Sequence, residues 1–157
     1  MNRNMLAIAA TCFAGLALAL SAGAQQASDI EAVKAAHQSF YKALSARDAK
    51  AMEAVWANKP YVINIGPPDK NIAVGFADAV SQYWPKAFDA MPKIAVTSAI
   101  TQVQTDGKIA WVVGTEIANL QTKSGESLKL DIIVTNIFEK EGDRWLMVSH
   151  HALPIPK

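Results

Sequence analysis

The segment Ile109–Gln121 reads IAWVVGTEIANLQ, and the segment Leu128–Glu139 reads LKLDIIVTNIFE. Both are long, rich in β-branched residues and separated by a short polar stretch that contains a glycine, a composition typical of a β-hairpin. Two further stretches of the same kind, Ile94–Thr105 and Trp145–Ala152, flank them. The C-terminal half therefore predicts four long antiparallel strands, and strands of this length usually curl around something rather than lie flat.

The residues before these strands show helical periodicity. Ser28 and Glu31 form a capping box, which predicts the start of a helix, and apolar residues then recur three and four positions apart. Asp48 predicts the cap of a second helix. The mature domain therefore opens with two helices.

Two short strands and a third helix are expected next. The stretches 61–65 and 72–75 are apolar and are separated by a turn rich in proline and glycine. The third helix carries Pro85 inside it, and this proline should kink or divide the helix.

The first 24 residues have the pattern of a secretory signal peptide. Arg3 gives a positive start, an apolar run extends to Leu20, and Ala22-Gly23-Ala24 supplies the small residues of an A-x-A cleavage site. Cleavage after Ala24 would leave residues 25–157 as one domain in the periplasm or secreted. The apolar run is short and a polar stretch follows it, so we expect no membrane association after cleavage.

Composition narrows the classes of function. Cys12 would leave with the signal peptide, so the mature domain would have no disulfide and no thiol nucleophile. The 15 Lys and Arg residues fall to 14 without Arg3 and match the 14 Asp and Glu residues, with no long run of either sign. A nucleic-acid groove normally shows a basic stripe, so we expect no nucleic-acid partner. Zinc-site spacings and phosphate loops are missing as well, so we expect neither a metal nor a cofactor.

The order of elements and several short motifs resemble the NTF2-like superfamily, in particular its SnoaL-like and DUF4440-type members. The motifs are Ser45-Ala46-Arg47-Asp48, Val55-Trp56-Ala57, Ile65-Gly66-Pro67, Gly75-Phe76 and the terminal strand Gly142–His151, in which a tryptophan is followed six residues later by a histidine. They extend over nearly the whole chain after residue 24.

This resemblance implies an α+β fold in which three helices from the N-terminal half pack on a strongly curved, mainly antiparallel sheet. The sheet and helices form a cone with a pocket between them, and members often form homodimers paired through the sheet, so we expect a homodimer. The superfamily includes isomerases, hydratases, epoxide hydrolases, polyketide cyclases and non-catalytic binding domains, so the pocket residues have to decide the function.

Isomerases and cyclases of this fold resemble one another in using a pocket aspartate or histidine to move a proton. The first short strand offers no carboxylate before Asp69, which departs from the steroid-isomerase pattern. The long strands carry Glu116 and Asp131, and the sequence does not show which strand face lines the cone. A solvated position on the outer face is the plainer expectation for both acids.

Only one residue of the pair His150 and His151 can face the pocket, because neighbouring strand residues point to opposite faces. His151 has the same parity as Trp145 and Met147 and occupies the family's terminal histidine position, so we expect His151 to line the pocket or its rim. If the domain is catalytic, we expect His151 or Asp131 to accept a proton and Tyr41 to donate a hydrogen bond.

Aromatic residues are numerous for so small a domain, and some of them should border the cone. A pocket lined by aromatic rings with a few polar groups suits a flat, apolar small molecule, although ordinary core packing is the alternative for each ring. The residues expected to bind the ligand are Trp56, Tyr61, Trp84, Trp111, Asn64, Asn119 and His37.

The sequence thus predicts an exported SnoaL-like domain that binds a small, largely apolar molecule, with or without acid/base chemistry. The alternative is a non-catalytic homo-oligomeric scaffold or partner-binding module whose cavity is incidental.

Overall fold

A computed structural model describes residues 4–67 and 69–156, with the backbone alone for residues 4–22. The elements are α1 Asn4–Ala46, α2 Ala49–Val55, β1 Ile63–Ile65, β2 Ala73–Val74, the π-helical segment η1 Ala77–Gln82, α3 Tyr83–Ala90, β3 Lys93–Thr105, β4 Ile109–Gln121, β5 Ser127–Glu141 and β6 Arg144–Pro154. The expected order of elements is confirmed, and β4 has the bounds that the sequence predicts.

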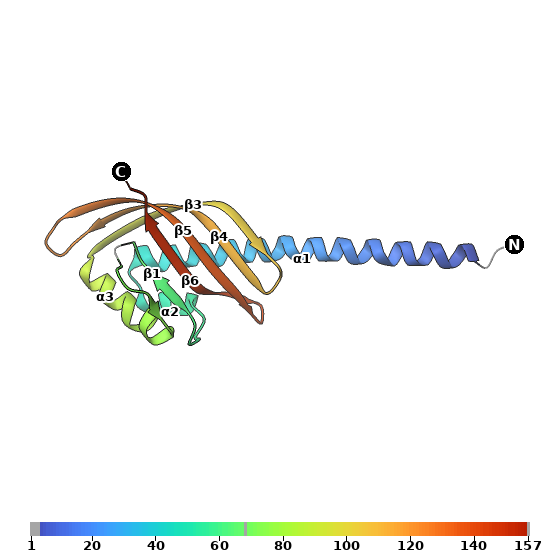
Figure 1. Ribbon diagram of the computed structural model, residues 1–157, viewed down its shortest axis with the longest axis horizontal. Coiled ribbons are helices and arrows are strands. Elements are labelled where there is room, and N and C mark those ends of the chain that lie inside the picture. The colour runs from blue at the N-terminus through green and yellow to red at the C-terminus, as the bar shows by residue number, and fades with distance from the viewer. Residues whose placement is uncertain (1–3, 68, 157) are drawn as a thin grey trace.

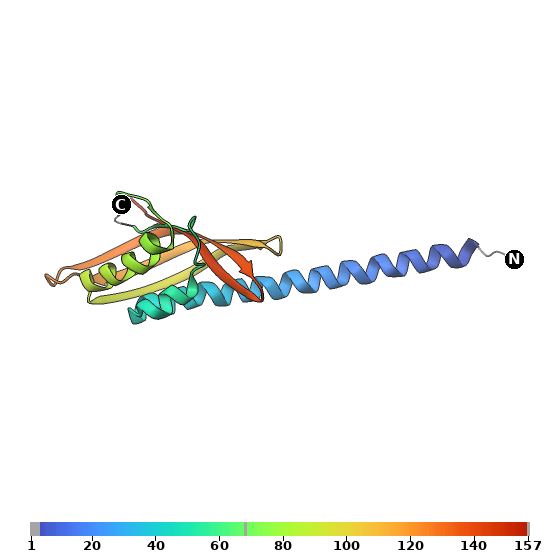
Figure 2. The same cartoon turned by 90° about the horizontal axis from the view of Figure 1, so that it is seen from below.

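The six strands form one sheet in the order β2-β1-β6-β5-β4-β3. Neighbouring strands are antiparallel except β1 and β6, which are parallel. The sheet is curved, and helices α1, α2 and α3 lie on one side of it (Figures 1 and 2). We call the side that meets the helices the inner face and the opposite side the outer face. The predicted fold class, α+β with three helices on a strongly curved, mainly antiparallel sheet, is confirmed.

Helix α1 is longer than the sequence predicted. It continues without a break through Ser28, so Ser28 is not an N-cap in this chain. The preceding residues are rich in alanine and leucine, which are good helix formers, so nothing ends the helix before Ser28. The N-terminal half of α1 projects away from the domain (Figure 1). In the described part of the chain, no helix combines the length and the apolar content that crossing a membrane requires.

The two shorter helices begin and end for recognisable reasons. The Asp48 carboxylate accepts a hydrogen bond from the Ala51 backbone N–H at 2.9 Å, so Asp48 is the N-cap of α2 as predicted. The third helical region is divided into η1 and α3, also as predicted. Pro85 is the third residue of α3, in the first turn, where a backbone N–H has no partner within the helix.

The core lies between the helices and the inner face. Phe40 of α1 and Met52 of α2 are fully buried against an interior that includes Phe138 of β5 and Met147 of β6. Gly114 is also on the inner face, opposite a bulge in β3. A Cβ atom at this position would overlap the carbonyl oxygen of Ala99, so glycine permits the close approach of β3 and β4 there.

Strand β6 contains a β-bulge at Val148. Met147 pairs with Phe138 and Ser149 pairs with Ile137, so one step along β5 corresponds to two along β6. The extra residue shifts the alternation of side chains by one position. Residues on the two sides of Val148 therefore follow opposite parities.

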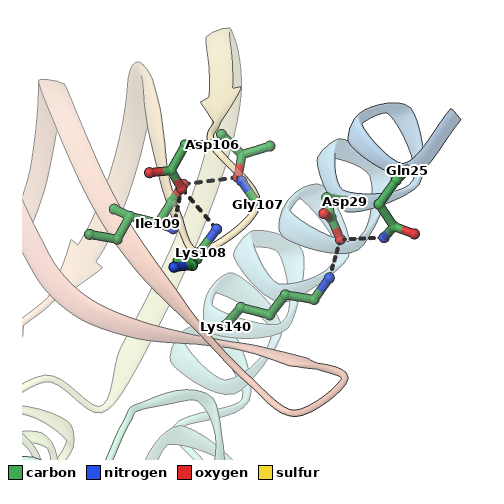
Figure 3. Close-up of polar contacts among 8 residues, drawn as sticks. Gln25, Asp29, Asp106, Gly107, Lys108, Ile109 and Lys140 are labelled. Carbon is green, nitrogen blue, oxygen red and sulfur yellow. Dashed lines mark hydrogen bonds and ion pairs between the residues drawn. The ribbon is translucent and has the colours of Figure 1, made fainter. Parts of the chain in front are cut away.

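A partly buried ion pair ties helix α1 to the sheet. An oxygen of Asp29 in α1, which is 4% exposed, lies 2.5 Å from Nζ of Lys140 in β5, and Gln25 donates a second hydrogen bond to it (Figure 3). The hydrogen bond from Lys140 lowers the pKa of Asp29. Beside it, Asp106 accepts hydrogen bonds from two backbone N–H groups of the β3–β4 turn.

We expect Asp29→Asn to lower the melting temperature at neutral pH, because the variant loses the carboxylate that Lys140 neutralises. The folded-state pKa of Asp29 lies below its ordinary value of 3.8. The stabilisation is therefore complete above that value and is lost as the pH falls through the folded-state pKa. Thermal unfolding at neutral and acidic pH measures both effects.

The matched control is Glu31→Gln, which breaks an exposed ion pair between Glu31 and Lys34. An exposed pair contributes little, so this variant should unfold close to the wild-type temperature. Equal losses in the two variants would contradict a special role for the Asp29–Lys140 pair.

Candidate functional site

A cavity of about 80 Å³ lies between the inner face and the helices. Its walls are mostly apolar and come from α1, α3, strands β3 to β6 and the segment that follows β1. The apolar wall residues are Leu44, Pro67, Trp84, Ala87, Met91, Ile94, Val96, Leu120 and Leu130. Glu116 of β4, Tyr83 of α3 and His150 of β6 are ionisable groups in the wall, and burial is the largest cause of the pKa shift of each.

Glu116 is 5% exposed and accepts a hydrogen bond from the Tyr41 hydroxyl through Oε1. Burial raises the pKa of Glu116, and the hydrogen bond from Tyr41 acts in the opposite direction. Burial and the charge of Glu116 raise the pKa of Tyr41 as well. The phenol therefore keeps its proton, and Glu116 is the member of the pair that can exchange one.

Asn136 of β5 joins this pair to the two buried histidines. Its Oδ1 lies 2.7 Å from Nδ1 of His150, and its Nδ2 lies 3.2 Å from Nδ1 of His37 and 3.5 Å from the Tyr41 hydroxyl. Nε2 of His37 lies 3.0 Å from Oγ of Ser98. We call the connected set the buried polar network, and its members are His37, Tyr41, Ser98, Glu116, Asn136 and His150.

Both histidines of the buried polar network are neutral at neutral pH. Burial lowers the pKa of His37 to about 4 and that of His150 to about 3, with a smaller contribution from neighbouring histidines to the second value. Phe40 packs beside the ring of His150 at 4.9 Å between centroids and beside Trp84 at 5.5 Å. The rings keep water away from the histidine.

A loop at the cavity wall is held by Asp69. Its Oδ2 accepts a hydrogen bond from the Gly66 backbone N–H at 2.6 Å and another from the Tyr83 hydroxyl at 2.8 Å. Burial, and then the hydrogen bond to Asp69, raise the pKa of Tyr83. Asp69 therefore positions part of the wall, where Gly66 and Tyr83 both lie.

The structure brings together three of the residues predicted from the sequence. Tyr41 and His37 belong to the buried polar network, and Trp84 lies in the cavity wall. Asn64 and Trp56 are buried but outside that wall. Asn64 donates a hydrogen bond to the Ala79 carbonyl at 3.1 Å and so fastens η1 to β1, while Trp56 packs in the core.

Four predicted site residues lie away from the cavity, and these predictions are wrong in position. Tyr61 is 49% exposed and donates a hydrogen bond to Glu139. Trp111, Asn119 and Asp131 are exposed on the outer face, because their strands place Val112, Ala118 and Ile132 on the inner one.

The expectation for His151 is wrong because of the bulge in β6. His151 is exposed on the outer face, and His150 is the buried histidine. His151 would share the face of Met147 in a regular strand, but the extra residue Val148 reverses the alternation before the histidines.

Glu116, for which a solvated position on the outer face was the plainer expectation, lies on the inner face, and Ser98 was not among the predicted site residues. Small and apolar residues on the Glu116 side of β4 were a usable signal, since Ala110, Val112, Gly114 and Ala118 are all buried with it. Asn136 has the parity of Ile132, Val134 and Phe138, which are the most buried residues of β5. Among the residues that the structure describes, no three His, Cys, Asp or Glu side chains gather to hold a metal.

Comparison with known proteins agrees with this architecture. Residues 33–155 match the SnoaL-like domain family. A calcium/calmodulin-dependent protein kinase type II association domain from Thiobacillus denitrificans is 30% identical, with a TM-score of 0.67 over 78% of this chain and 94% of that one. A dehydratase of the NTF2-like family from Streptomyces avermitilis is 22% identical, with a TM-score of 0.73 over 83% of this chain and 99% of that one.

A curated relative matches this chain over only part of its own length. The F-box protein SKIP8 of Arabidopsis thaliana is 29% identical over 126 residues, which are 77% of this chain and 48% of that protein. The chain thus spans about half the length of the curated relative. The fold is similar to that of NTF2-like proteins. The family match covers both helical and sheet parts of the domain, and the chain belongs to the SnoaL-like domain family.

Proposed function

We propose that this SnoaL-like domain binds a small, largely apolar molecule in the cavity and exchanges a proton with it through Glu116. The observation that supports the proposal is a buried carboxyl with a raised pKa in a mostly apolar wall. Such a carboxyl is expected in acid/base sites, because its pKa moves towards the pH at which it works.

The size of the cavity restricts the ligand. A single water needs roughly 10–15 Å³ of the same kind of volume, so about 80 Å³ accommodates a molecule of only a few heavy atoms. Tyr41 engages Oε1 of Glu116 and leaves the second oxygen for the ligand. Apolar residues such as Leu44 and Met91 would contact the rest of the molecule.

We also propose that the domain works in the periplasm or outside the cell, on the basis of the signal-peptide pattern of residues 1–24. Native mass spectrometry of the protein purified from its own host tests location and binding together. We expect a chain that begins at Gln25 and carries a stoichiometric small compound. The matched variant is Ala87→Leu, which adds bulk at the cavity wall and should lose the compound. If both proteins carry the same amount of the compound, or if neither carries any, binding in this cavity is contradicted. An uncleaved chain would contradict export.

Glu116→Gln should raise the melting temperature at neutral pH and abolish proton exchange with the ligand. Because the folded-state pKa of Glu116 is raised, the wild-type protein bears the cost of a buried carboxylate at high pH and is relieved of it as the pH falls and Glu116 binds a proton. The gain from the variant should therefore shrink in acid. Thermal unfolding as a function of pH measures it, with Glu126→Gln as the exposed control. A variant less stable than wild type at neutral pH would show that Glu116 is structural.

A second candidate function is self-association through the outer face. Four large apolar side chains, Trp111, Ile117, Ile133 and Leu153, are between 43% and 53% exposed there. Ile133 pairs with Leu153 and with Thr115, so the patch continues across β4, β5 and β6. Exposed apolar patches commonly mark interfaces, and a relative of 30% identity is an association domain. We therefore propose that a second copy of this chain covers the outer face.

Ile133→Lys should convert a dimer into a monomer, because it places a charge at the centre of the apolar patch. Analytical ultracentrifugation measures the change in mass. The control is Val74→Lys, which makes the same kind of substitution at an exposed position on β2, away from the patch. A monomeric wild-type protein, or a dimer that survives Ile133→Lys, would contradict pairing through this face.

A further inference from the structure

We infer that Glu116 determines, through Tyr41 and Asn136, which nitrogen of His150 carries the proton, so that the cavity presents a bare ring nitrogen and selects a ligand with a hydroxyl or N–H group. This inference rests on the proposed binding in the same cavity and specifies the class of ligand.

The relay begins at the contact between Tyr41 and Glu116, in which the Tyr41 hydroxyl donates its proton to Oε1 of Glu116. Having spent its only hydrogen, the Tyr41 oxygen can accept hydrogen bonds from other groups but cannot donate one.

The Tyr41 oxygen then fixes the orientation of the Asn136 amide. Nδ2 of Asn136 faces the Tyr41 oxygen and Nδ1 of His37, and it has one hydrogen for each. The reversed amide would place its oxygen against the Tyr41 oxygen, with no hydrogen between them. The amide oxygen therefore has to face His150.

His150 consequently has a single tautomer. Its Nδ1 lies 2.7 Å from Oδ1 of Asn136, an acceptor, so Nδ1 carries the proton. Burial keeps the ring neutral, since the pKa of His150 is lowered to about 3. Nε2 is therefore bare, and no described residue hydrogen-bonds to it. His37 takes the opposite form, with Nδ1 bare and Nε2–H directed at Ser98.

Because Glu116 and His150 both lie in the cavity wall, we take a carboxylate oxygen of Glu116 and Nε2 of His150 as the two acceptors that a ligand there would meet. A ligand with a hydroxyl or N–H group satisfies an acceptor when it enters. A ketone of the same shape leaves both acceptors desolvated and unpaired, which costs affinity.

Nitrogen-15 NMR of the protein labelled at histidine tests the relay directly in the ligand-free protein, because protonated and bare ring nitrogens have well-separated chemical shifts. We expect a protonated Nδ1 and a bare Nε2 for His150, and the reverse for His37, at neutral pH. The variant His151→Gln removes the signals of the third histidine, which is exposed and lies outside the buried polar network, and so identifies them in the spectrum. In Glu116→Gln the new amide can donate to Tyr41, so His150 should become a mixture of tautomers. A protonated Nε2 in the wild type, or an unchanged tautomer in Glu116→Gln, would overturn the relay.

Cyclopentanol and cyclopentanone test the ligand class as a matched pair. Titration followed by NMR should show the alcohol binding about tenfold more tightly than the ketone. Asn136→Leu removes the link that fixes the tautomer and should reduce this preference. Equal affinities in the wild type would overturn the selection for a donor while leaving cavity binding intact. If neither compound binds, the proposed function fails for ligands of this kind, and the histidine spectrum still decides the relay.

Discussion

Helix α1 meets strand β4 through the hydrogen bond from Tyr41 to Glu116. A buried carboxylate loses several kcal/mol of solvation, so the surrounding structure has to supply donors. Tyr41 supplies one, and its own oxygen is satisfied by Asn136, which also serves both buried histidines. Each polar group on the inner face thereby limits where its neighbour can point. The directions of these hydrogen bonds, as well as apolar contacts, thus determine how α1 is placed over the sheet.

Secondary structure was largely predictable because its signals are local. Strand β4 was predicted with its observed bounds, and Asp48 was recognised as a cap from its position alone. His37 and Tyr41, which were predicted to contact a ligand, are both buried in α1. The continuous course of α1 through Ser28 was missed, because a capping box indicates a start only where the preceding residues do not already form a helix.

The face of each strand was harder to predict than the strand itself. In β4 and β5 both faces carry large apolar residues, such as Ile117 and Ile133 outside and Val112 and Ile132 inside, so alternation does not distinguish them. If the outer face is an interface, as we propose, this ambiguity has a physical cause: both faces are covered by protein. The position of the cavity then depends on pairing between distant strands, which no single segment of sequence reveals.

The bulge at Val148 bears on how relatives should be compared. Deleting the bulged residue Val148 would make Met147 and Ser149 consecutive in a regular strand and would leave His150 on the inner face, one position earlier in the sequence. Homologous domains can therefore keep a histidine in the same place in space while its position in an ungapped alignment changes by one. Straightening the bulge without removing a residue would instead turn His151 inward, so the adjacent pair at positions 150 and 151 would keep an imidazole on the inner face in both cases, which a lone histidine would not do.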